Sequence, residues 1–295
     1  MEKIKNSLFQ MINSGLLLLF SFSCIYPFYY IIINSLSNPA DIANGVYFIP
    51  KNITWAAYQQ LSHIPNLYHS VFISVARTIV GTVLTVMSCT FVGYLVTKKH
   101  MPCRKWIYRF FIFTMFFNSG LIPWYMIMKE LHLKNNFLLY VLPSMISAFF
   151  IILIKTYIES LPTSLEESAE VDGAGTLTIF TKIIFPLSMP IVACIAVFTA
   201  VNQWNSWADN FYLVSDSRLD TLQLLLYRNL QSNMANMLQS SASSTTAASM
   251  SSSAHVTATS IKHAMTVITV LPILVVYPLM QKYFVKGIML GAVKG

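Results

Sequence analysis

The chain has 295 residues, of which 55% are hydrophobic and only 10% charged, and its mean hydropathy is +0.59. An average soluble domain has roughly 25% charged residues, so this composition excludes an ordinary soluble core. The net charge is +8, but the Lys and Arg residues are scattered between apolar runs and accompany no nucleic-acid motif. The four cysteines lie far apart, without the spacing of a disulfide framework or a metal site.

Long apolar stretches separated by charged connectors predict an all-α polytopic membrane protein, because about 20 helical residues cross the hydrocarbon of a bilayer. The first stretch, residues 16–33, follows Lys3 and Lys5 and is too long for the apolar core of a signal peptide, so we expect a retained anchor helix. We expect one transmembrane domain over residues 1–295, with six spans at residues 8–33, 70–96, 107–128, 137–157, 184–204 and 262–284.

The orientation of the spans follows from the distribution of Lys and Arg, which are retained on the cytoplasmic side. With the N-terminus inside, the inner connectors hold most of these residues, and residues 97–109 form a strongly basic one. Both termini are therefore predicted to be cytoplasmic. Arg77 lies alone within a span, and we expect it to snorkel toward the outer interface or to pair locally.

Two outer connectors are long. The first, residues 34–69, contains several prolines and aromatic residues and is expected to be ordered without regular structure. The second, residues 209–260, has helical periodicity over residues 219–238. Its remainder, residues 240–260, is mostly Ser, Thr and Ala, which predicts a flexible or variable loop.

The inner connector at residues 161–183 is acidic although the rest of the inner face is basic. Four of the acidic residues fall within seven positions: Glu166, Glu167, Glu170 and Asp172. Thr163 and Ser164 each precede a Glu by three residues, which is the pattern of a capping box and predicts the start of a short helix. Gly173 can end that helix, and Thr176 can cap a second one that leads toward the membrane.

The predicted helix can have two roles. Leu165, Ser168, Ala169 and Asp172 share one face, whose small side chains would permit close docking of a partner. A solvated, well-capped loop helix would have the same composition. Composition alone leaves both interpretations open, and the spacing of the whole segment favours docking.

The segment resembles the EAA loop of permease subunits in binding-protein-dependent ABC importers. That pattern is Glu-Ala-Ala, three residues, Gly, nine residues, Ile, one residue and Leu-Pro. Here it is Glu167-Ser168-Ala169, then Gly173, Ile183 and Phe185-Pro186, with Ser168 and Phe185 as the two departures.

The chain resembles, over nearly its full length, the carbohydrate importer class typified by the G subunit of the maltose permease, and within that class permeases for complex polysaccharides, including the aldouronate type. The extension Asp172-Gly173-Ala174, residues 185–190 and the ending at residues 291–295 carry the similarity to the maltose class. The similarity to the polysaccharide permeases is carried by the segment that begins at Tyr283 and by the pairs Leu271-Pro272 and Tyr277-Pro278.

The resemblance implies the fold of a type I ABC importer permease, in which the EAA loop is a cytoplasmic coupling helix that docks on an ATPase. The implied coupling residues are Glu166, Glu167, Ser168, Ala169, Asp172, Gly173, Ala174, Ile183 and Pro186. The implied tail between the ATPase subunits comprises Gly291, Val293, Lys294 and Gly295, whose alternative is a frayed terminus. The chain has no phosphate-binding Gly-x-x-x-x-Gly-Lys-Ser/Thr sequence, so we expect it to be no enzyme and to bind no cofactor, with ATP and Mg²⁺ on the partner.

The expected cargo is a sugar or oligosaccharide, with a polysaccharide-derived fragment as one option. Amide and Trp side chains near the span ends could bond sugar hydroxyls and stack on sugar rings. These candidates are Asn118, Trp124, Asn202, Trp204, Asn205 and Trp207. Amides that stabilise helix contacts and Trp residues of an interfacial belt are the alternative interpretation.

The implied partners are a second permease, forming a heterodimer, an ABC ATPase dimer and an extracellular solute-binding protein. An ion-coupled secondary transporter is the competing function, but it would require charges near the bilayer midplane, and few ionisable residues lie deep in the spans. A membrane enzyme would require a cluster of His, Cys, Asp or Glu residues, and the sequence has none at a span end.

Overall fold

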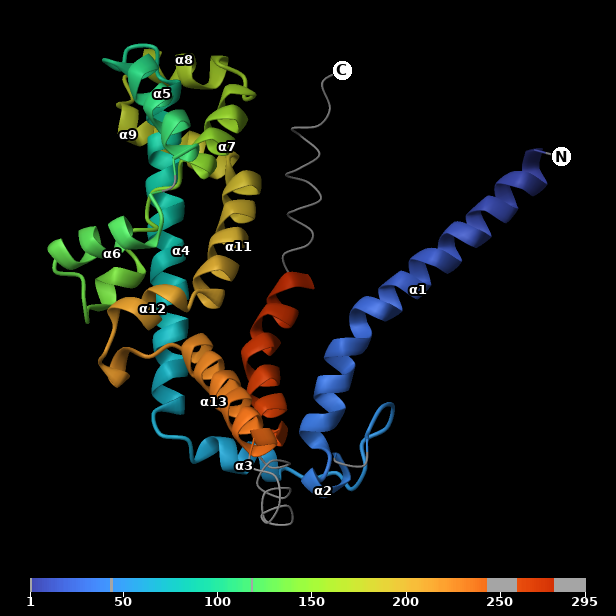
Figure 1. Cartoon of the computed structure of the whole chain (residues 1–295). Helices are drawn as coiled ribbons and strands as arrows, with labels where there is room; N and C mark the ends of the chain where they lie inside the picture. Colours follow the sequence, from blue (N-terminus) through green and yellow to red (C-terminus); the bar gives the residue numbers. More distant parts are fainter. Residues whose placement is uncertain (1, 43–44, 118, 243–258, 279–295) are drawn as a thin grey trace. The chain divides into compact units, whose positions relative to one another are not determined.

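The computed structural model describes residues 2–42, 45–117, 119–242 and 259–278. Within these ranges the chain forms helices and turns, without a strand (Figure 1). The chain divides into two compact units. The first comprises Met1–Leu67 and Leu226–Leu271, and the second Tyr68–Leu225 and Pro272–Gly295.

The first unit begins with the long apolar helix α1 (Glu2–Leu36), which contains Pro27. Two short helices follow, α2 (Pro39–Ile42) and α3 (Ala56–Ser62). The expectation of a connector without regular structure at residues 34–69 is therefore wrong in part. The chain between α2 and α3 turns back along α1 (Figure 1), held by backbone hydrogen bonds such as Thr54 N–H to the Leu36 carbonyl, 2.9 Å.

The second unit is built around α4 (Leu67–Thr97). Gly93 of α4 lies against Ile154 of α7 (Ala148–Glu159), and a Cβ at Gly93 would come within 2.8 Å of that side chain. The same core continues to Ile195 of α11 (Met189–Asn205). Burial of these aliphatic side chains therefore packs α4, α7 and α11 together.

Three predicted spans do not coincide with one continuous helix, and one of them, residues 184–204, is broken by a bend at Ser188. Residues 107–128 are divided between α5 (Arg104–Met115) and α6 (Leu121–Glu130), with Gly120 at φ +78° before α6. At about 1.5 Å per residue, neither helix alone crosses a hydrocarbon layer of about 30 Å. Residues 137–157 begin with a single 3₁₀ turn, η1 (Phe137–Tyr140), and become helical again at α7.

The acidic connector forms the predicted short helix, α8 (Ser164–Val171). It is bent by 79° from α7. After α8 come α9 (Thr176–Ile179), the π-helical turn η2 (Phe180–Ile184) and α10 (Phe185–Leu187), which lead into α11 through a second bend of 79°. In Figure 1, α5, α8 and α9 gather at the C-terminal end of α4.

The second outer connector starts with α12 (Ala208–Leu213) and η3 (Ser217–Leu219). The helical periodicity predicted for residues 219–238 is confirmed by α13 (Leu222–Ala242). Most of the Ser/Thr/Ala-rich tract, residues 243–258, lies outside the described residues.

Three helices of the described residues are long and apolar enough to cross a membrane: Phe9–Leu36, Leu67–Thr97 and Thr259–Pro278. Counting each bent helix pair as one span raises the number to five. The predicted spans at residues 8–33 and 70–96 agree with the first two helices. The predicted span at residues 262–284 agrees with the third as far as the structure describes it.

Candidate functional site

The helix α8 is tied to the C-terminal end of α4 by one lysine. The ammonium of Lys98 lies 2.6 Å from Glu166 and 3.5 Å from Glu170, and it sits over the ring of Tyr94 at 4.8 Å. Burial disfavours the charged form of Lys98, but the hydrogen bonds to Glu166 and Tyr94 outweigh it and raise the pKa of Lys98. A raised pKa keeps Lys98 charged at neutral pH, so the lysine does not titrate there.

The helix α8 has one side that faces the protein core and one that faces solvent, which we call its outer side. Ala169 is buried in the same core as Phe180 and Ile184, so it does not form the centre of an exposed surface as predicted. Glu167, Ser168 and Asp172 are exposed. Beside them Val171 has 87% of its surface exposed.

The ends of α8 differ from the predicted caps. Thr163 is the residue before the helix, but its side chain makes no capping hydrogen bond, and Gly175, instead of Thr176, precedes α9. Gly173 has φ +78° and nothing within 4 Å of the position of a Cβ, so the backbone there is open to close approach.

The remaining predicted coupling residues lie where the connector returns to the membrane. The N–H of Ala174 donates to the carbonyl of Ala169 (2.9 Å), and Ala174 and Ile183 pack against the core. Pro186 is exposed in the first turn of α10, where proline needs no hydrogen-bond partner. The following bend falls at Ser188, before Pro190.

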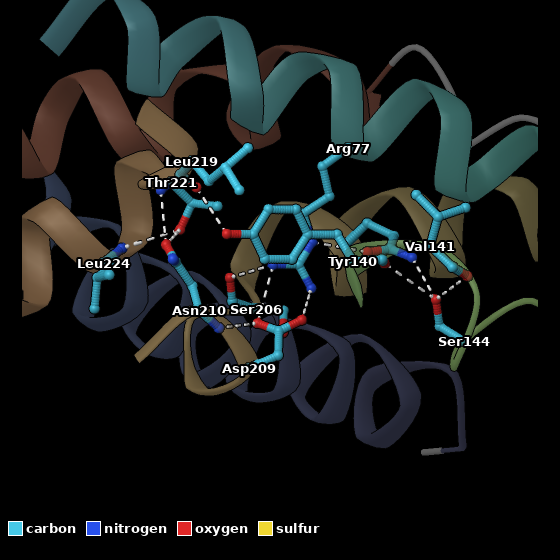
Figure 2. A network of polar contacts seen from close by, with 11 residues as sticks. Arg77, Tyr140, Val141, Ser144, Ser206, Asp209, Asn210, Leu219, Thr221 and Leu224 are labelled. Atoms are coloured by element: carbon cyan, nitrogen blue, oxygen red, sulfur yellow. Dashed lines mark hydrogen bonds and ion pairs between the residues drawn. The ribbon is translucent and has the colours of Figure 1, made fainter. Parts of the chain in front are cut away.

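A buried ion pair lies in the second unit, where Arg77 belongs to the N-terminal half of α4 (Figure 2). Arg77 has 3% of its surface exposed. Its guanidinium makes a bidentate ion pair with the carboxylate of Asp209, with one N···O distance of 3.0 Å. Of the two expectations for Arg77, snorkelling to the interface is therefore wrong, whereas pairing within the protein is confirmed. Its partner lies on α12, 132 residues further along the chain, because folding brings the two helices together.

Further polar contacts surround this ion pair. Arg77 Nε–H donates to Gln203 Oε1 (2.9 Å), and the Gln203 amide donates to the Ser144 hydroxyl (2.7 Å). The guanidinium also lies over the ring of Tyr140 at 4.6 Å. Gly81 makes room for the Gln203 amide, since a Cβ there would come within 2.5 Å of it. Most donors of Arg77 are thus used within the chain.

A cavity of about 840 Å³ opens beside this network. Its lining combines aromatic side chains with amide and hydroxyl groups: Trp124, Phe149, Phe198, Ser144, Asn202 and Gln203 are among the lining residues. Ligand sites of this size typically have such a mixture of apolar walls and a few polar groups. Of the predicted cargo residues, Trp124 and Asn202 line the cavity.

The other predicted cargo residues lie elsewhere. Trp204 is buried and does not line the cavity. Asn205 is exposed and accepts a hydrogen bond from Gln223 (2.9 Å), and Trp207 packs against Phe211. Asn118 and the tail residues Gly291, Val293, Lys294 and Gly295 are outside the described residues.

A family model decides the identity of the chain. The model of the inner membrane component of binding-protein-dependent transport systems matches residues 89–290, more than half of the chain. The chain belongs to this family. It is a permease component of an ABC importer and a multi-pass protein of the cell membrane, and the competing assignment as an ion-coupled transporter is set aside.

Individual relatives agree with this assignment along the whole permease. The chain is 33% identical to the polygalacturonan/rhamnogalacturonan transport system permease protein YtcP of Bacillus subtilis, over 99% of this chain and 100% of that protein. It is 35% identical to protein LplC of the same organism, over 92% and 90% of the two chains. A crystallised bacterial ABC transporter involved in the import of the acidic polysaccharide alginate has a similar chain, with a TM-score of 0.82, 28% identity and coverage of 95% and 98%.

Two residues of these sites, Lys98 and Tyr140, are not predicted by the sequence. Lys98 was one of many basic residues in a connector, and nothing in its neighbourhood indicates that it pairs with α8. Tyr140 resembled any other aromatic residue in an apolar stretch. The lone Arg77 in a span was a usable signal, because an intramembrane charge requires a partner.

Breaking the Arg77–Asp209 pair should destabilise the permease. Arg77→Met or Asp209→Leu leaves one buried charge without its partner, which costs about 3–5 kcal/mol. Because the double variant leaves no unpaired charge, it should be less destabilised than the sum of the single variants. The measurement is the thermal unfolding midpoint of the purified protein in detergent. Additive effects, or single variants with wild-type midpoints, would contradict the pairing.

Proposed function

We propose that this permease moves a sugar or oligosaccharide, such as a fragment of a polysaccharide, inward across the cell membrane. The observation that carries the proposal is the cavity beside the Arg77–Asp209 pair, with Trp124 and Asn202 in its lining. Aromatic faces suit sugar rings, and amides suit sugar hydroxyls. The names of the relatives, which include polygalacturonan/rhamnogalacturonan transport and alginate import, support this class of cargo.

The charges at the cavity indicate how the cargo is held. Arg77 and Asp209 line it, but they neutralise one another and the guanidinium is almost fully buried. The cavity wall therefore offers ring stacking and neutral hydrogen bonds. An acidic fragment would direct its carboxylates away from this wall, toward a partner subunit.

The energy for transport comes from a separate ABC ATPase dimer, which binds ATP and Mg²⁺. The outer side of α8, with Glu167, Ser168, Val171 and Asp172, serves as the docking surface, and Gly173 permits close approach of the partner backbone. Glu166 and Ala169 act differently, since their contacts with Lys98 and the core fix α8 to the permease. The tail at residues 291–295 is assigned to the ATPase interface on the basis of the sequence alone.

The full assembly contains a second permease, forming a heterodimer, and an extracellular solute-binding protein.

Both termini of this chain are cytoplasmic and six spans cross the membrane, with residues 209–260 on the outer side. The positive-inside distribution and the position of α8 in a basic region support this orientation. Binding of ATP draws the coupling helices together and turns the cavity outward.

Replacing Asn202 by Ala should weaken cargo binding in the cavity. Loss of one neutral hydrogen bond costs about 0.5–1.5 kcal/mol, so the KM for uptake should rise about two- to tenfold. Uptake of labelled galacturonate oligomers into cells with matched permease levels measures this. Asn205→Ala is the matched control, because Asn205 carries the same amide outside the cavity lining. Equal KM values for the two variants would remove Asn202 from the path.

Reversing the charge of Glu167 should uncouple the ATPase. Glu167→Lys replaces an exposed carboxylate that pairs with a basic group of the partner, so solute-stimulated ATP hydrolysis in proteoliposomes should fall on the order of tenfold. The control is Glu130→Lys, the same change at an exposed carboxylate at the end of α6. Loss of activity in both variants, or in neither, would count against α8 as the coupling helix.

A further inference from the structure

The loop at residues 45–55 of the first unit carries an exposed apolar tip. Tyr47, Phe48 and Ile49 follow one another there with 59%, 64% and 75% of their surface exposed. Val46, directly before them, is buried against the rest of the unit, so the loop has a defined position along α1. Three large apolar side chains in succession are not a usual ending for a loop in water.

The backbone of the tip is satisfied by side chains of α1. Three consecutive carbonyls, those of Val46, Tyr47 and Phe48, each accept a hydrogen bond from an α1 side chain. In the same order the donors are Asn34 at 3.1 Å, Tyr26 at 3.4 Å and Tyr29. A loop in water needs no such donors, because water bonds its carbonyls. In lipid an unsatisfied carbonyl costs several kcal/mol, so protein donors are required there.

The position along α1 gives the depth of the tip. The most apolar part of α1, residues 16–33, is 18 residues long, or about 27 Å, and nearly fills a hydrocarbon layer of about 30 Å. Tyr26 and Tyr29 precede the end of this part by four to seven residues, which is about 6–10 Å along the helix. Elements that lie in a membrane interface are buried to about 5–10 Å, the same depth.

The base of the loop is more polar and lies at the end of α1. The Lys51 N–H donates to the Ser37 hydroxyl (3.2 Å), and the Asn52 amide donates to Asp41 (2.8 Å). Trp55 is exposed close to this end. Lys and Trp are residue types favoured at the level of the lipid headgroups. The loop is thus polar at its base, beside the C-terminal end of α1, and apolar at its tip, beside the apolar part of α1.

We propose that residues 47–49 are inserted into the lipid bilayer, at the boundary between the acyl chains and the headgroups, as an anchor for the outer loop beside α1. Lipid covers residues 47–49. Hydrocarbon accommodates exposed apolar side chains, and it requires that backbone carbonyls find their donors within the protein. The inference does not depend on the identity of the cargo or on the coupling mechanism.

Spin labels can test the insertion in the assembled transporter in liposomes. The exposed Cys24 and Cys103 are first replaced by Ser, while Cys89 and Cys194 are buried and remain. A nitroxide is then attached at Ile49→Cys or, in a second variant, at Phe48→Cys. The control is Gln59→Cys, an exposed polar position on α3. Collision rates with oxygen, which concentrates in lipid, and with a water-soluble nickel chelate are measured for each label.

Insertion predicts frequent collisions with oxygen and few with the nickel chelate at positions 48 and 49, and the reverse at position 59. Collision with the chelate at the rate of position 59 would show that the tip lies in water. Protection from both reagents would show that another protein chain covers it. Either result would overturn the proposal, and transport by the labelled variants verifies that the assembly is intact.

Discussion

The scarcity of water in a bilayer is the constraint on which the second unit depends. A polar group there must find its partner inside the protein, because an unpaired charge in hydrocarbon is costly. Arg77 meets this requirement through Asp209, Gln203 and the face of Tyr140, which come from segments far apart in the chain. The ion pair therefore fixes α4, η1, α11 and α12 against one another, and the cavity forms beside this junction.

The same helices connect the cavity with the surface assigned to the ATPase. α4 carries Arg77 in its N-terminal half, and Lys98, which directly follows its C-terminal end, holds α8 through its ammonium. α11 carries Asn202 and Gln203 near its C-terminal end, and its N-terminal end follows the bend at Ser188. A displacement of α8 would therefore be passed to the cavity wall by two packed helices. Coupling of this kind requires discrete arrangements of rigid elements. The close packing of Gly93 of α4 on Ile154 of α7, in a core that also contains Ile195 of α11, supplies that rigidity.

Much of this architecture can be predicted from local sequence signals. The long apolar stretches predicted α1 and α4. The Glu-rich segment predicted α8, and Gly173 after it predicted the end of that helix. The interruption at Gly120 and the turn before α7 were missed, because an apolar stretch has the same hydropathy whether it is straight or broken. The burial of Ala169 and the pairing of Lys98 were also missed, since both depend on which side of α8 faces the core, and that is decided by tertiary packing.

The proposed mechanism requires that nucleotide on the ATPase change access to the cavity of this permease. The most direct measurement is the rate at which a membrane-impermeant maleimide, added from outside, modifies Asn202→Cys in the assembled transporter, with Cys24 and Cys103 replaced by Ser. We expect a faster reaction when the ATPase is held closed by a non-hydrolysable ATP analogue than without nucleotide. Equal rates in the two states would contradict it.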